Sequence, residues 1–575
     1  MVTVSTNDEE QPLLAGTTNT VDSDFDSNGS EVHDVSFSSS KNAREMTIER
    51  RRLKFIFPAL AIGIFLAACD QTIIVSSYAQ IGSDLNELDK IAWLATAYLC
   101  TTTSFQPLYG KLGDIFGSKA CIVFAYSIFG FGAMLCGLAR NMNQLIVARA
   151  LTGVGAGGIV TVVSILLSNI VTLEERGIWQ GYVNMVFACG AGLGAPLGGI
   201  LTDAIGWRWA FIAQGPLCAI AVLLISALLQ LPAESRSQKA ELKRVDFLGA
   251  ASLISCLVLL LVFLDQLASD KANKWESYSW LIGSAILLFL FLSVEKRYAF
   301  DPLTPLRLLF GREFLGAYLA LAFGNVAWYG IIFYVPLLYQ AVGHFPASVA
   351  GALLLPGIGS GIIGGFVGGA ILKRREAAGF FRLAIGSYPL VTTACIGVAL
   401  GAGVFWTGAP VAAVIVVVSI SLFIGGLGNG GGMTATLVVV VVVASPEDQA
   451  IVTACVYLYR QLGTTIGLAI ISLVFRRALA KSLIQRLSNM PELRLDTEEV
   501  LKGVGRSLKY LDQLPLEGRI IVEAAYGDAC VAVFIVCAAL AICAVVSSFF
   551  INEERAKHHK TSLAELQDEV DEENR

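Results

Sequence analysis

The stretch LKFIFPALAIGIFLAACDQTIIVSSYAQ, residues 53–80, decides the fold class of this chain. It is long and apolar enough to cross a lipid bilayer as a helix, which takes about 20 residues. Its second half carries one acidic residue, Asp70. A carboxylate inside a membrane-spanning helix is costly to keep there, so we expect it to face a polar cavity and to handle protons or cations.

Apolar stretches of similar length recur along most of the chain. Of the 575 residues, 55% are hydrophobic and only 15% are charged, a composition typical of a membrane protein with many spans. The spans are predicted near 53–78, 92–109, 120–139, 143–167, 179–201, 209–230, 247–264, 279–294, 314–340, 347–371, 383–402, 411–443, 450–474 and 529–551. The sequence therefore predicts an all-α polytopic membrane protein with fourteen spans.

Basic residues indicate which side of the membrane each loop occupies. The cluster Arg50, Arg51, Arg52 and Lys54 precedes the first span, and Lys and Arg accumulate in cytosolic loops, so the N-terminus is expected in the cytosol. The predicted loop 475–528 lies on the opposite side although it holds nine Lys and Arg. Its pattern of apolar and basic residues predicts an amphipathic helix that lies on the membrane surface or caps the protein.

The two ends of the chain are polar. Residues 1–50 are rich in Ser, Asn, Asp and Thr, and we expect a disordered cytosolic tail there. Within it, Glu9, Leu13 and Leu14 resemble an acidic dileucine sorting signal, which would be recognised by a trafficking adaptor. Residues 552–575 are predicted to form a second cytosolic tail.

The distribution of chemistry-bearing residues excludes several classes of protein. All twelve cysteines lie in apolar stretches, and no CxxC is accompanied by histidine partners, so we expect free thiols and no metal site. No cluster of a nucleophile with a base is present at useful spacing, which argues against an enzyme. We also expect no cofactor and no nucleic-acid partner.

The loop between the second and third predicted spans reads GKLGDIFGSK, residues 110–119. This stretch predicts a tight turn with two glycines, Gly110 and Gly117, one acid, Asp114, and a flanking base, Lys119. Such a turn suits a cytosolic gate, because the acid can pair with a cation or a helix N-terminus of a neighbouring element in one conformation only. The loop resembles the signature loop of the major facilitator superfamily, although positions 115 and 118 lack the arginines usual there. An ordinary charged loop is the alternative interpretation.

The fourth predicted span contains LIVARALTGVGAGG, residues 145–158, with Arg149 inside the membrane. This stretch resembles the fourth-helix motif of the same superfamily, in which an intramembrane arginine is associated with proton transfer. The alternative is an arginine that extends to the membrane surface from near the helix end. The glycines also match the letters of a dinucleotide-binding motif, but no strand precedes them, so we interpret them as helix-packing residues.

The fifth predicted span contains GAGLGAPLGG, residues 190–199. Gly194, Pro196, Gly198 and Gly199 in this stretch resemble the proline-glycine motif of the superfamily's antiporters. Closely spaced glycines permit near contact between helices, and a proline removes one backbone hydrogen bond, so a pivot is expected. A role in packing alone stays open.

Further motifs point to one branch of the superfamily. DQTIIV at 70–75 and YRQLG at 459–463, which includes Arg460, resemble the fourteen-span drug:proton antiporters of the second type. The stretch 93–110 most resembles fungal vacuolar basic amino acid transporters. This resemblance implies two six-helix bundles, 53–230 and 313–551, with linkers and two inserted spans in 231–312.

The resemblance also implies an activity, namely proton-coupled antiport of amino acids, especially basic ones, from the cytosol into the vacuole by alternating access. Asp70, Arg149 and Arg460 would handle the proton and the cationic substrate, although an ion pair between Asp70 and either arginine that only holds helices together is an alternative. Polar residues expected to line the cavity are Gln106, Asn184, Gln214, Asn325, Tyr339, Gln340 and Asn429. Rival functions are a multidrug:proton exporter of the plasma membrane, an iron-siderophore importer and a nutrient sensor that does not transport.

Overall fold

The computed structural model describes residues 31–171, 173–229, 247–268, 274–297, 306–374, 377–404, 410–444, 448–490 and 497–551. Within these ranges all regular elements are helical, and thirteen helical segments are long and apolar enough to cross a membrane. Helix α2 (Ala92–Phe116) lies among them as a fourteenth span. Its run of hydroxyl residues, Thr101 to Ser104, makes it less apolar than the others. The predicted all-α membrane fold is confirmed, and α2 brings the spans to the predicted fourteen.

The N-terminal bundle contains six spans. They are α1 (Glu31–Leu85), α2, α3 (Ser118–Leu138), α4 (Met142–Ile170), α5 (Leu173–Ile205), and the pair α6 (Trp207–Ile212) and α7 (Gln214–Leu228), which together form the sixth. In this bundle α1 packs against α5, both α2 and α3 pack against α4, and α3 packs against α7.

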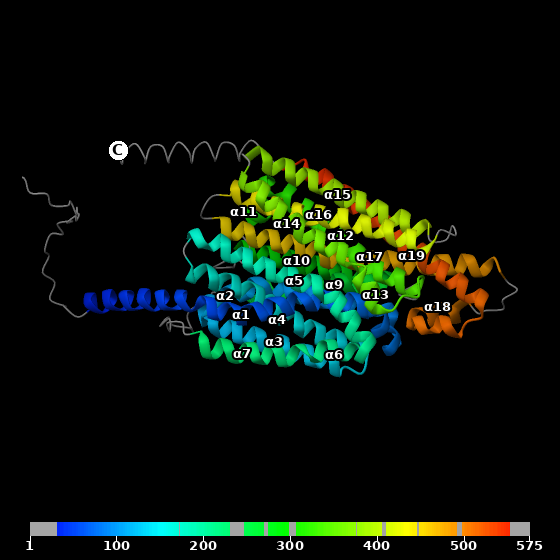
Figure 1. Cartoon of the computed structure of the whole chain (residues 1–575), viewed down its shortest axis with the longest axis horizontal. Helices are drawn as coiled ribbons and strands as arrows, with labels where there is room; N and C mark the ends of the chain where they lie inside the picture. The colour runs from blue at the N-terminus through cyan, green and yellow to red at the C-terminus, as the bar shows by residue number, and fades with distance from the viewer. Residues whose placement is uncertain are drawn as a thin grey trace, which may run out of the picture.

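The C-terminal bundle repeats this arrangement. Its spans are α12 (Arg312–Ala341), the pair α13 (Ala347–Ala352) and α14 (Leu355–Arg374), α15 (Ala377–Val404), α16 (Val411–Val443), α17 (Gln449–Ser488) and α19 (Leu516–Ser548). Here α12 packs against α17, both α14 and α15 pack against α16, and α15 packs against α19. The bundles meet through two equivalent pairs, α5 with α13 and α2 with α17 (Figure 1). Repeated halves with a shared interface are the usual framework for alternating access.

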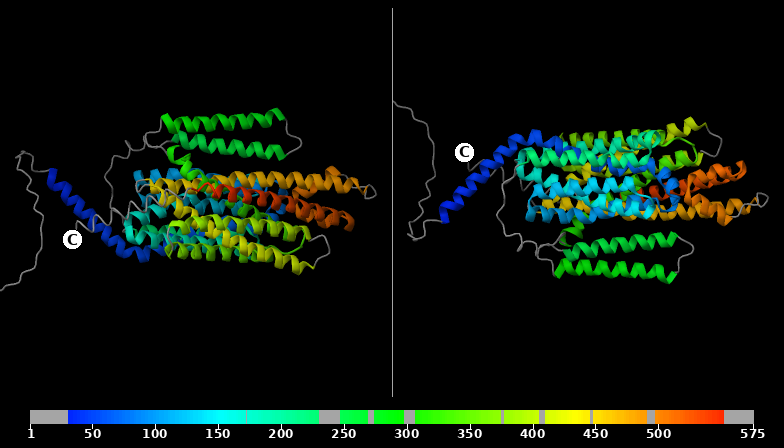
Figure 2. Two further views of the ribbon diagram at one scale, coloured as in Figure 1. Left: turned by 90° about the horizontal axis from the view of Figure 1, so that it is seen from above. Right: turned by 90° about the horizontal axis from the view of Figure 1, so that it is seen from below.

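Two inserted helices, α9 (Phe247–Ala268) and α10 (Lys274–Arg297), pack mainly against each other. Figure 2 shows this pair, in green, standing beside the remaining helices. Only α9 makes substantial contact with the core, at α2 and α17, while Trp275 and Phe289 of α10 are largely exposed. An exposed apolar face of this kind suits contact with lipid. The short helix α11 (Leu306–Leu309) follows.

The structure differs from the expected loop 475–528. Helix α17 continues to Ser488 and α19 begins at Leu516, which leaves α18 (Thr497–Arg506) and the 3-10 helix η4 (Leu508–Gln513) between them. In the extension of α17 the buried residues Leu479, Leu483 and Leu487 recur every four residues, so one face stays packed while the helix leaves the apolar region. Helix α18 lies at this end of the molecule (Figure 1).

The structure also differs from the expected tail 1–50, because α1 begins at Glu31. The residues before the first span include the strong helix formers Ala43, Arg44, Glu45 and Met46, so α1 extends beyond the predicted span toward the N-terminus. The dileucine-like residues Glu9, Leu13 and Leu14 and the tail 552–575 lie outside the described residues.

Candidate functional site

The centre of the N-terminal bundle holds a buried ion pair. Arg149 on α4 donates through Nη1 to the Oδ2 atom of Asp70 on α1 at 2.5 Å, and both side chains are fully buried. Gln214 of α7 donates through Nε2 to Asp70 Oδ1 at 3.2 Å, and Arg149 Nε donates to the carbonyl oxygen of Leu94 on α2 at 3.2 Å. Four helices of one bundle therefore converge on a single pair of charges.

Glycines of α4 allow this convergence. A Cβ atom on Gly157 would lie 2.7 Å from the carbonyl oxygen of Thr102 on α2, and one on Gly155 would overlap the backbone of Phe129 on α3. These glycines therefore pack helices, as interpreted above, and they bring α4 close enough for Arg149 to reach α1. Because the guanidinium is buried and paired with Asp70, Arg149 does not extend to the membrane surface, which overturns that alternative.

Aromatic rings enclose the guanidinium of Arg149. Its Cζ atom lies 4.5 Å from the ring centroid of Tyr98 and 5.7 Å from that of Phe211, distances at which a ring face attracts a cation. The hydroxyl of Tyr98 donates to the carbonyl oxygen of Ala67 at 3.1 Å, which fixes the ring. One guanidinium nitrogen, Nη2, is buried and has no hydrogen-bond partner among the described residues.

A small cavity lies between the two bundles beside this pair. Its lining residues come from α1, α2, α4, α12 and α17 and are Gln71, Val75, Ala95, Tyr98, Leu99, Arg149, Tyr329, Ile332, Phe333 and Leu468. The cavity has about 20 Å³ for the centres of water-sized molecules, which is room for about one water. An amino acid is larger than this cavity and would enter it only after the bundles separate.

The cavity wall combines residues of both bundles. Tyr329 of α12 donates its hydroxyl to Oε1 of Gln71 on α1 at 3.3 Å, and Phe333 stacks on Tyr78 with ring centroids 4.7 Å apart. Arg149 lies between Asp70 and this space, because Arg149 lines the cavity whereas Asp70 contacts Arg149 and Gln214. A charge change at Asp70 is therefore transmitted to the cavity through the arginine.

The second arginine candidate, Arg460, has different neighbours. It lies on α17 in the C-terminal bundle, where Nη1 contacts the Met433 sulfur at 3.4 Å and the guanidinium lies 5.0 Å from the ring centroid of Tyr457. Asp70 is therefore paired with Arg149, and its ion pair lies within one bundle.

Most of the polar residues expected to line the cavity lie elsewhere. Asn325 donates to the Thr464 hydroxyl at 2.8 Å inside the C-terminal bundle, and Gln106 lies on α2 two helical turns beyond the lining residue Leu99. The side chain of Asn184 lies outside the described residues. In this conformation neither Asn325 nor Gln106 lines the cavity: Asn325 pairs with a neighbouring hydroxyl, and Gln106 lies at a different depth in the membrane.

Other cavity residues were missed by the sequence analysis. Gln71, Tyr98, Tyr329 and Phe333 line the site. Gln71 directly follows the intramembrane acid, and an adjacent polar residue in an apolar span is a signal that could have found it. The aromatic residues gave no such signal, because aromatic residues are common in spans and only the packing of the two bundles brings these together.

The gate motif forms the turn between α2 and α3. Gly117 has a φ of +81°, which favours glycine because a side chain would be strained there. Lys119 donates to the carbonyl oxygen of Ser226 in the last turn of α7 at 2.9 Å, a favourable place for a cation. The Asp114 side chain lies outside the described residues, and a Cβ on Gly110 would have only one neighbour within 4 Å. The proposed gate therefore stays a prediction.

The proline-glycine motif brings α5 against α1. A Cβ atom on Gly198 would lie 2.6 Å from the carbonyl oxygen of Ile73, and one on Gly194 would overlap Thr72. Pro196 lies between these two contacts inside α5 and removes one backbone donor. Close packing is thus a definite role of the motif, and a pivot stays a prediction.

The same end of α5 also joins the two bundles. A Cβ atom on Gly199 would lie 2.7 Å from Cα of Ser348 on α13, and the backbone N–H of Ser348 donates to Asp203 Oδ2 at 2.7 Å. Nearby, Gln340 Nε2 of α12 donates to the carbonyl oxygen of Ser76 on α1 at 3.1 Å, so Gln340 holds the bundles together and does not line the cavity. With the predicted topology these contacts close the non-cytosolic side.

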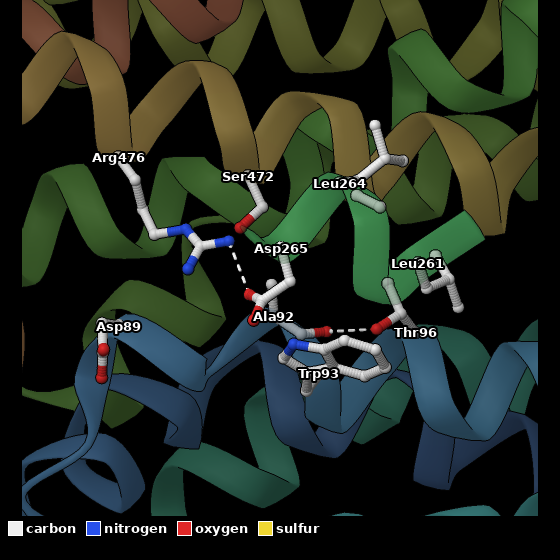
Figure 3. A pocket seen from close by; sticks show the side chains of 10 residues that line it. Asp89, Ala92, Trp93, Thr96, Leu261, Leu264, Asp265, Ser472 and Arg476 are labelled. Atoms are coloured by element: carbon white, nitrogen blue, oxygen red, sulfur yellow. Dashed lines mark hydrogen bonds and ion pairs between the residues drawn. The ribbon is translucent and has the colours of Figure 1, made fainter. Parts of the chain in front are cut away.

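A second pocket lies at the non-cytosolic end, where an ion pair joins the inserted helix α9 to α17. Arg476 of α17 donates to Asp265 of α9 at 2.7 Å, with Trp93 of α2 and Asp89 of η1 (Leu88–Lys90) in the same pocket wall (Figure 3). Burial raises the pKa of the Asp89 carboxyl above its usual value, against the opposing effect of the Arg476 guanidinium. This pocket lies apart from the ion pair of the N-terminal bundle.

The repeated bundles and the buried ion pair beside a cavity between them define a membrane transporter, not an enzyme. Residues 60–468 match the Major Facilitator Superfamily, and the chain belongs to this superfamily. Its structure resembles a bacterial homologue of the human lysosomal transporter Spinster in an inward-facing, unoccupied conformation, with a TM-score of 0.55, 14% identity and coverage of 87% of this chain and 98% of the other. That similarity supports the fold alone.

Three relatives are similar over much of their length. The chain is 34% identical to the vacuolar membrane amino acid uptake transporter fnx2 of Schizosaccharomyces pombe, covering 88% of this chain and 85% of the relative. It is 32% identical to multidrug resistance protein fnx1 of the same species, covering 82% and 88%. It is 34% identical to vacuolar basic amino acid transporter 1 of Saccharomyces cerevisiae, covering 60% of each chain.

Proposed function

We propose that this chain is a proton-coupled antiporter that moves amino acids, basic ones in particular, from the cytosol into the vacuole. The observation that carries the proposal is the fully buried pair of Asp70 and Arg149 beside the cavity between the bundles. A buried acid that can gain or lose a proton beside a substrate cavity is the minimum that proton coupling requires. The names of the relatives fnx2 and vacuolar basic amino acid transporter 1 support the substrate class and the membrane.

The ion pair supplies the coupling step. While Asp70 is ionised, the pair is neutral and a cationic substrate can occupy the cavity. A proton from the acidic lumen neutralises Asp70 and leaves Arg149 as an unpaired positive charge in the cavity wall. At an effective dielectric constant of about 20, a substrate cation roughly 6 Å away would be repelled by ~3 kcal/mol. The proton therefore weakens the binding of the cationic groups of the substrate, as antiport requires.

The contacts between the bundles suggest how access alternates. The hydrogen bonds of Asp203 with Ser348 and of Gln340 with Ser76 lie toward the non-cytosolic side, so rocking open to the lumen would have to break them. In this proposal the close α1 and α5 contact at Gly198 acts as the pivot, and the turn at Gly117 with Asp114 acts as the cytosolic gate. Arg460 would accompany the motion in the C-terminal bundle. The N-terminal dileucine-like segment would direct the protein to the vacuole through an adaptor.

Transport by reconstituted vesicles tests this function. Purified protein is inserted into vesicles with an acidic interior, and labelled lysine uptake is measured together with the loss of internal protons. We expect uptake that collapses when the pH gradient is dissipated and that is lost in Asp70→Asn. Asp265→Asn, which removes an acid in the separate pocket, is expected to keep proton-driven uptake per folded molecule. Wild-type rates in Asp70→Asn would overturn the assignment.

A multidrug exporter is the second candidate, because the relative fnx1 is a multidrug resistance protein. It would use the same ion pair with a different substrate and in the plasma membrane. Uptake of a fluorescent lipophilic cation into the same vesicles, without lysine uptake, would favour it. A fluorescent fusion seen at the cell rim would agree, whereas a signal at the vacuolar membrane favours the amino acid transporter. A sensor would bind lysine without counterflow.

A further inference from the structure

Two buried polar atoms beside the ion pair lack hydrogen-bond partners among the described residues. One is the donor Nη2 of Arg149 and the other is the acceptor Oε1 of Gln214. Arg149 is fully buried and Gln214 is 3% exposed, so bulk solvent does not reach either atom. Buried polar atoms are nearly always paired, and each exception needs an explanation.

The identity of these two atoms follows from the contacts around them. Gln214 directs its Nε2 atom to two acceptors, Asp70 Oδ1 at 3.2 Å and the carbonyl oxygen of Ala210 at 3.0 Å. This fixes the amide orientation and leaves Oε1 as the open acceptor. Arg149 uses Nε and Nη1 for Leu94 and Asp70, which leaves Nη2 as the open donor.

We propose that Asp70, Arg149 and Gln214 form a subsite for the zwitterionic backbone of an α-amino acid. Once Arg149 has moved away from Asp70, the α-carboxylate would bind Arg149, beginning at the open Nη2, and the α-ammonium would bind Asp70 and the open Oε1 of Gln214. The substrate thereby replaces the internal ion pair with two pairs of its own. This inference rests on the proposed function and specifies which part of the substrate is recognised.

The charges of the site match this ligand better than a simple cation. A cation that bound Asp70 directly would separate it from Arg149 and leave a buried guanidinium without a counter-ion, which is costly. A zwitterion supplies an anion for Arg149 and a cation for Asp70 at once. Because the α-ammonium needs the ionised carboxylate of Asp70, proton and substrate compete for the same group, which agrees with antiport.

The cavity suits a side chain of the substrate, and of the three subsite residues it is Arg149 that lines it. Tyr98, Tyr329 and Phe333 provide aromatic surfaces next to Arg149, and ring faces attract ammonium and guanidinium groups. A basic side chain would lie along these rings, while the backbone subsite holds what all α-amino acids share. The buried subsite would thus bind the backbone of lysine, and the aromatic cavity wall would bind its side chain.

Lysine analogues test the subsite in the wild-type protein. Cadaverine lacks only the carboxylate of lysine, and 6-aminohexanoate lacks only the α-amine. Each is added in competition with labelled lysine in acidic-interior vesicles. Because a hydrogen bond to a charged group contributes about 1.5–3 kcal/mol, we expect each analogue to compete roughly 10- to 150-fold more weakly than unlabelled lysine.

A substitution gives an independent measurement. Gln214→Leu removes the open acceptor, and we expect the KM for lysine to rise roughly tenfold or more with a smaller change in maximal rate. Asn325→Leu is the matched control, because this buried amide pairs with Thr464 in the other bundle, and its KM should stay near the wild-type value. Fluorescence-detected gel filtration confirms that each variant is folded.

The outcomes separate the two proposals. If the wild-type protein transports lysine and either analogue competes as well as lysine, the subsite is wrong while the transport function stands. An unchanged KM in Gln214→Leu would equally overturn the role of Gln214. If wild-type vesicles take up no amino acid, the proposed function itself fails and the subsite fails with it.

Discussion

Neutralising one member of the buried ion pair should destabilise the protein more than neutralising both. Both side chains are fully buried. Asp70→Asn leaves the positive charge of Arg149 without a counter-ion, and Arg149→Gln leaves the negative charge of Asp70 without one. Two unit charges about 4 Å apart attract by ~4 kcal/mol at an effective dielectric constant near 20. This agrees with the ~3–5 kcal/mol lost when one partner of a buried pair is removed.

A double-mutant cycle measures that coupling. Thermal unfolding of the purified protein in detergent is compared for wild type, both single variants and the double variant. We expect each single variant to unfold ~5 °C lower, on the basis of about 2 cal/mol/K per residue over the membrane domain. The double variant should be at least ~2 kcal/mol more stable than the sum of the single effects, because it leaves no buried charge unpaired.

An exposed ion pair provides the control for this cycle. Arg307 and Asp448 form a salt bridge at 2.9 Å in which the arginine side chain is 77% exposed. Such a pair contributes less than about 1 kcal/mol, so its cycle should show weak coupling. Strict additivity at Asp70 and Arg149 would refute the reasoning, since it would mean that neither charge depends on the other.

Three further substitutions probe the packing and the pH response. Gly198→Val should abolish uptake and lower the unfolding temperature, because the valine side chain would collide with the Ile73 carbonyl. Gly386→Ala, at an open position, should change neither uptake nor unfolding temperature. Asp203→Ala removes the acceptor for the first turn of α13 and should cost about 1 kcal/mol of unfolding free energy, and no change in unfolding temperature would contradict that contact. Burial raises the pKa of Asp89, so the folded protein binds this proton more tightly than the unfolded chain. The stability of the wild type relative to Asp89→Asn should therefore increase as the pH falls through the raised pKa toward the usual value, and parallel pH profiles of unfolding temperature would refute it.

The span pattern was predictable because the bilayer sets a minimum length for each apolar stretch. The glycine motifs of α4 and α5 were predictable for a similar reason, since glycines at this density inside a span serve close helix packing. The sequence did not predict where α17 ends and α19 begins, because a helix that continues outside the membrane contains both apolar and charged residues. Its amphipathic pattern was visible in the sequence, but the sequence did not show that the face with Leu483 and Leu487 continues α17 and is buried.

The candidate site was predictable in part. Asp70 and Arg149 stand out in sequence because charges inside spans are rare and costly, but the choice between Arg149 and Arg460 as partner depends on which helices share a bundle. Gln214 was one of several polar residues in spans and had no feature that distinguished it from Asn325. What separates them is the tertiary packing that brings α7 to Asp70 and α12 to Thr464.

The division of the site between the bundles has a mechanical consequence. The charged and hydrogen-bonding groups, Asp70, Arg149 and Gln214, all belong to the N-terminal bundle, whereas Tyr329 and Phe333 of the C-terminal bundle supply aromatic surface. If the bundles rock as rigid bodies, the charged subsite keeps its geometry while the aromatic wall moves across it. Proton affinity and affinity for the substrate backbone can then be set within one bundle, and the other bundle determines which side of the membrane the site faces.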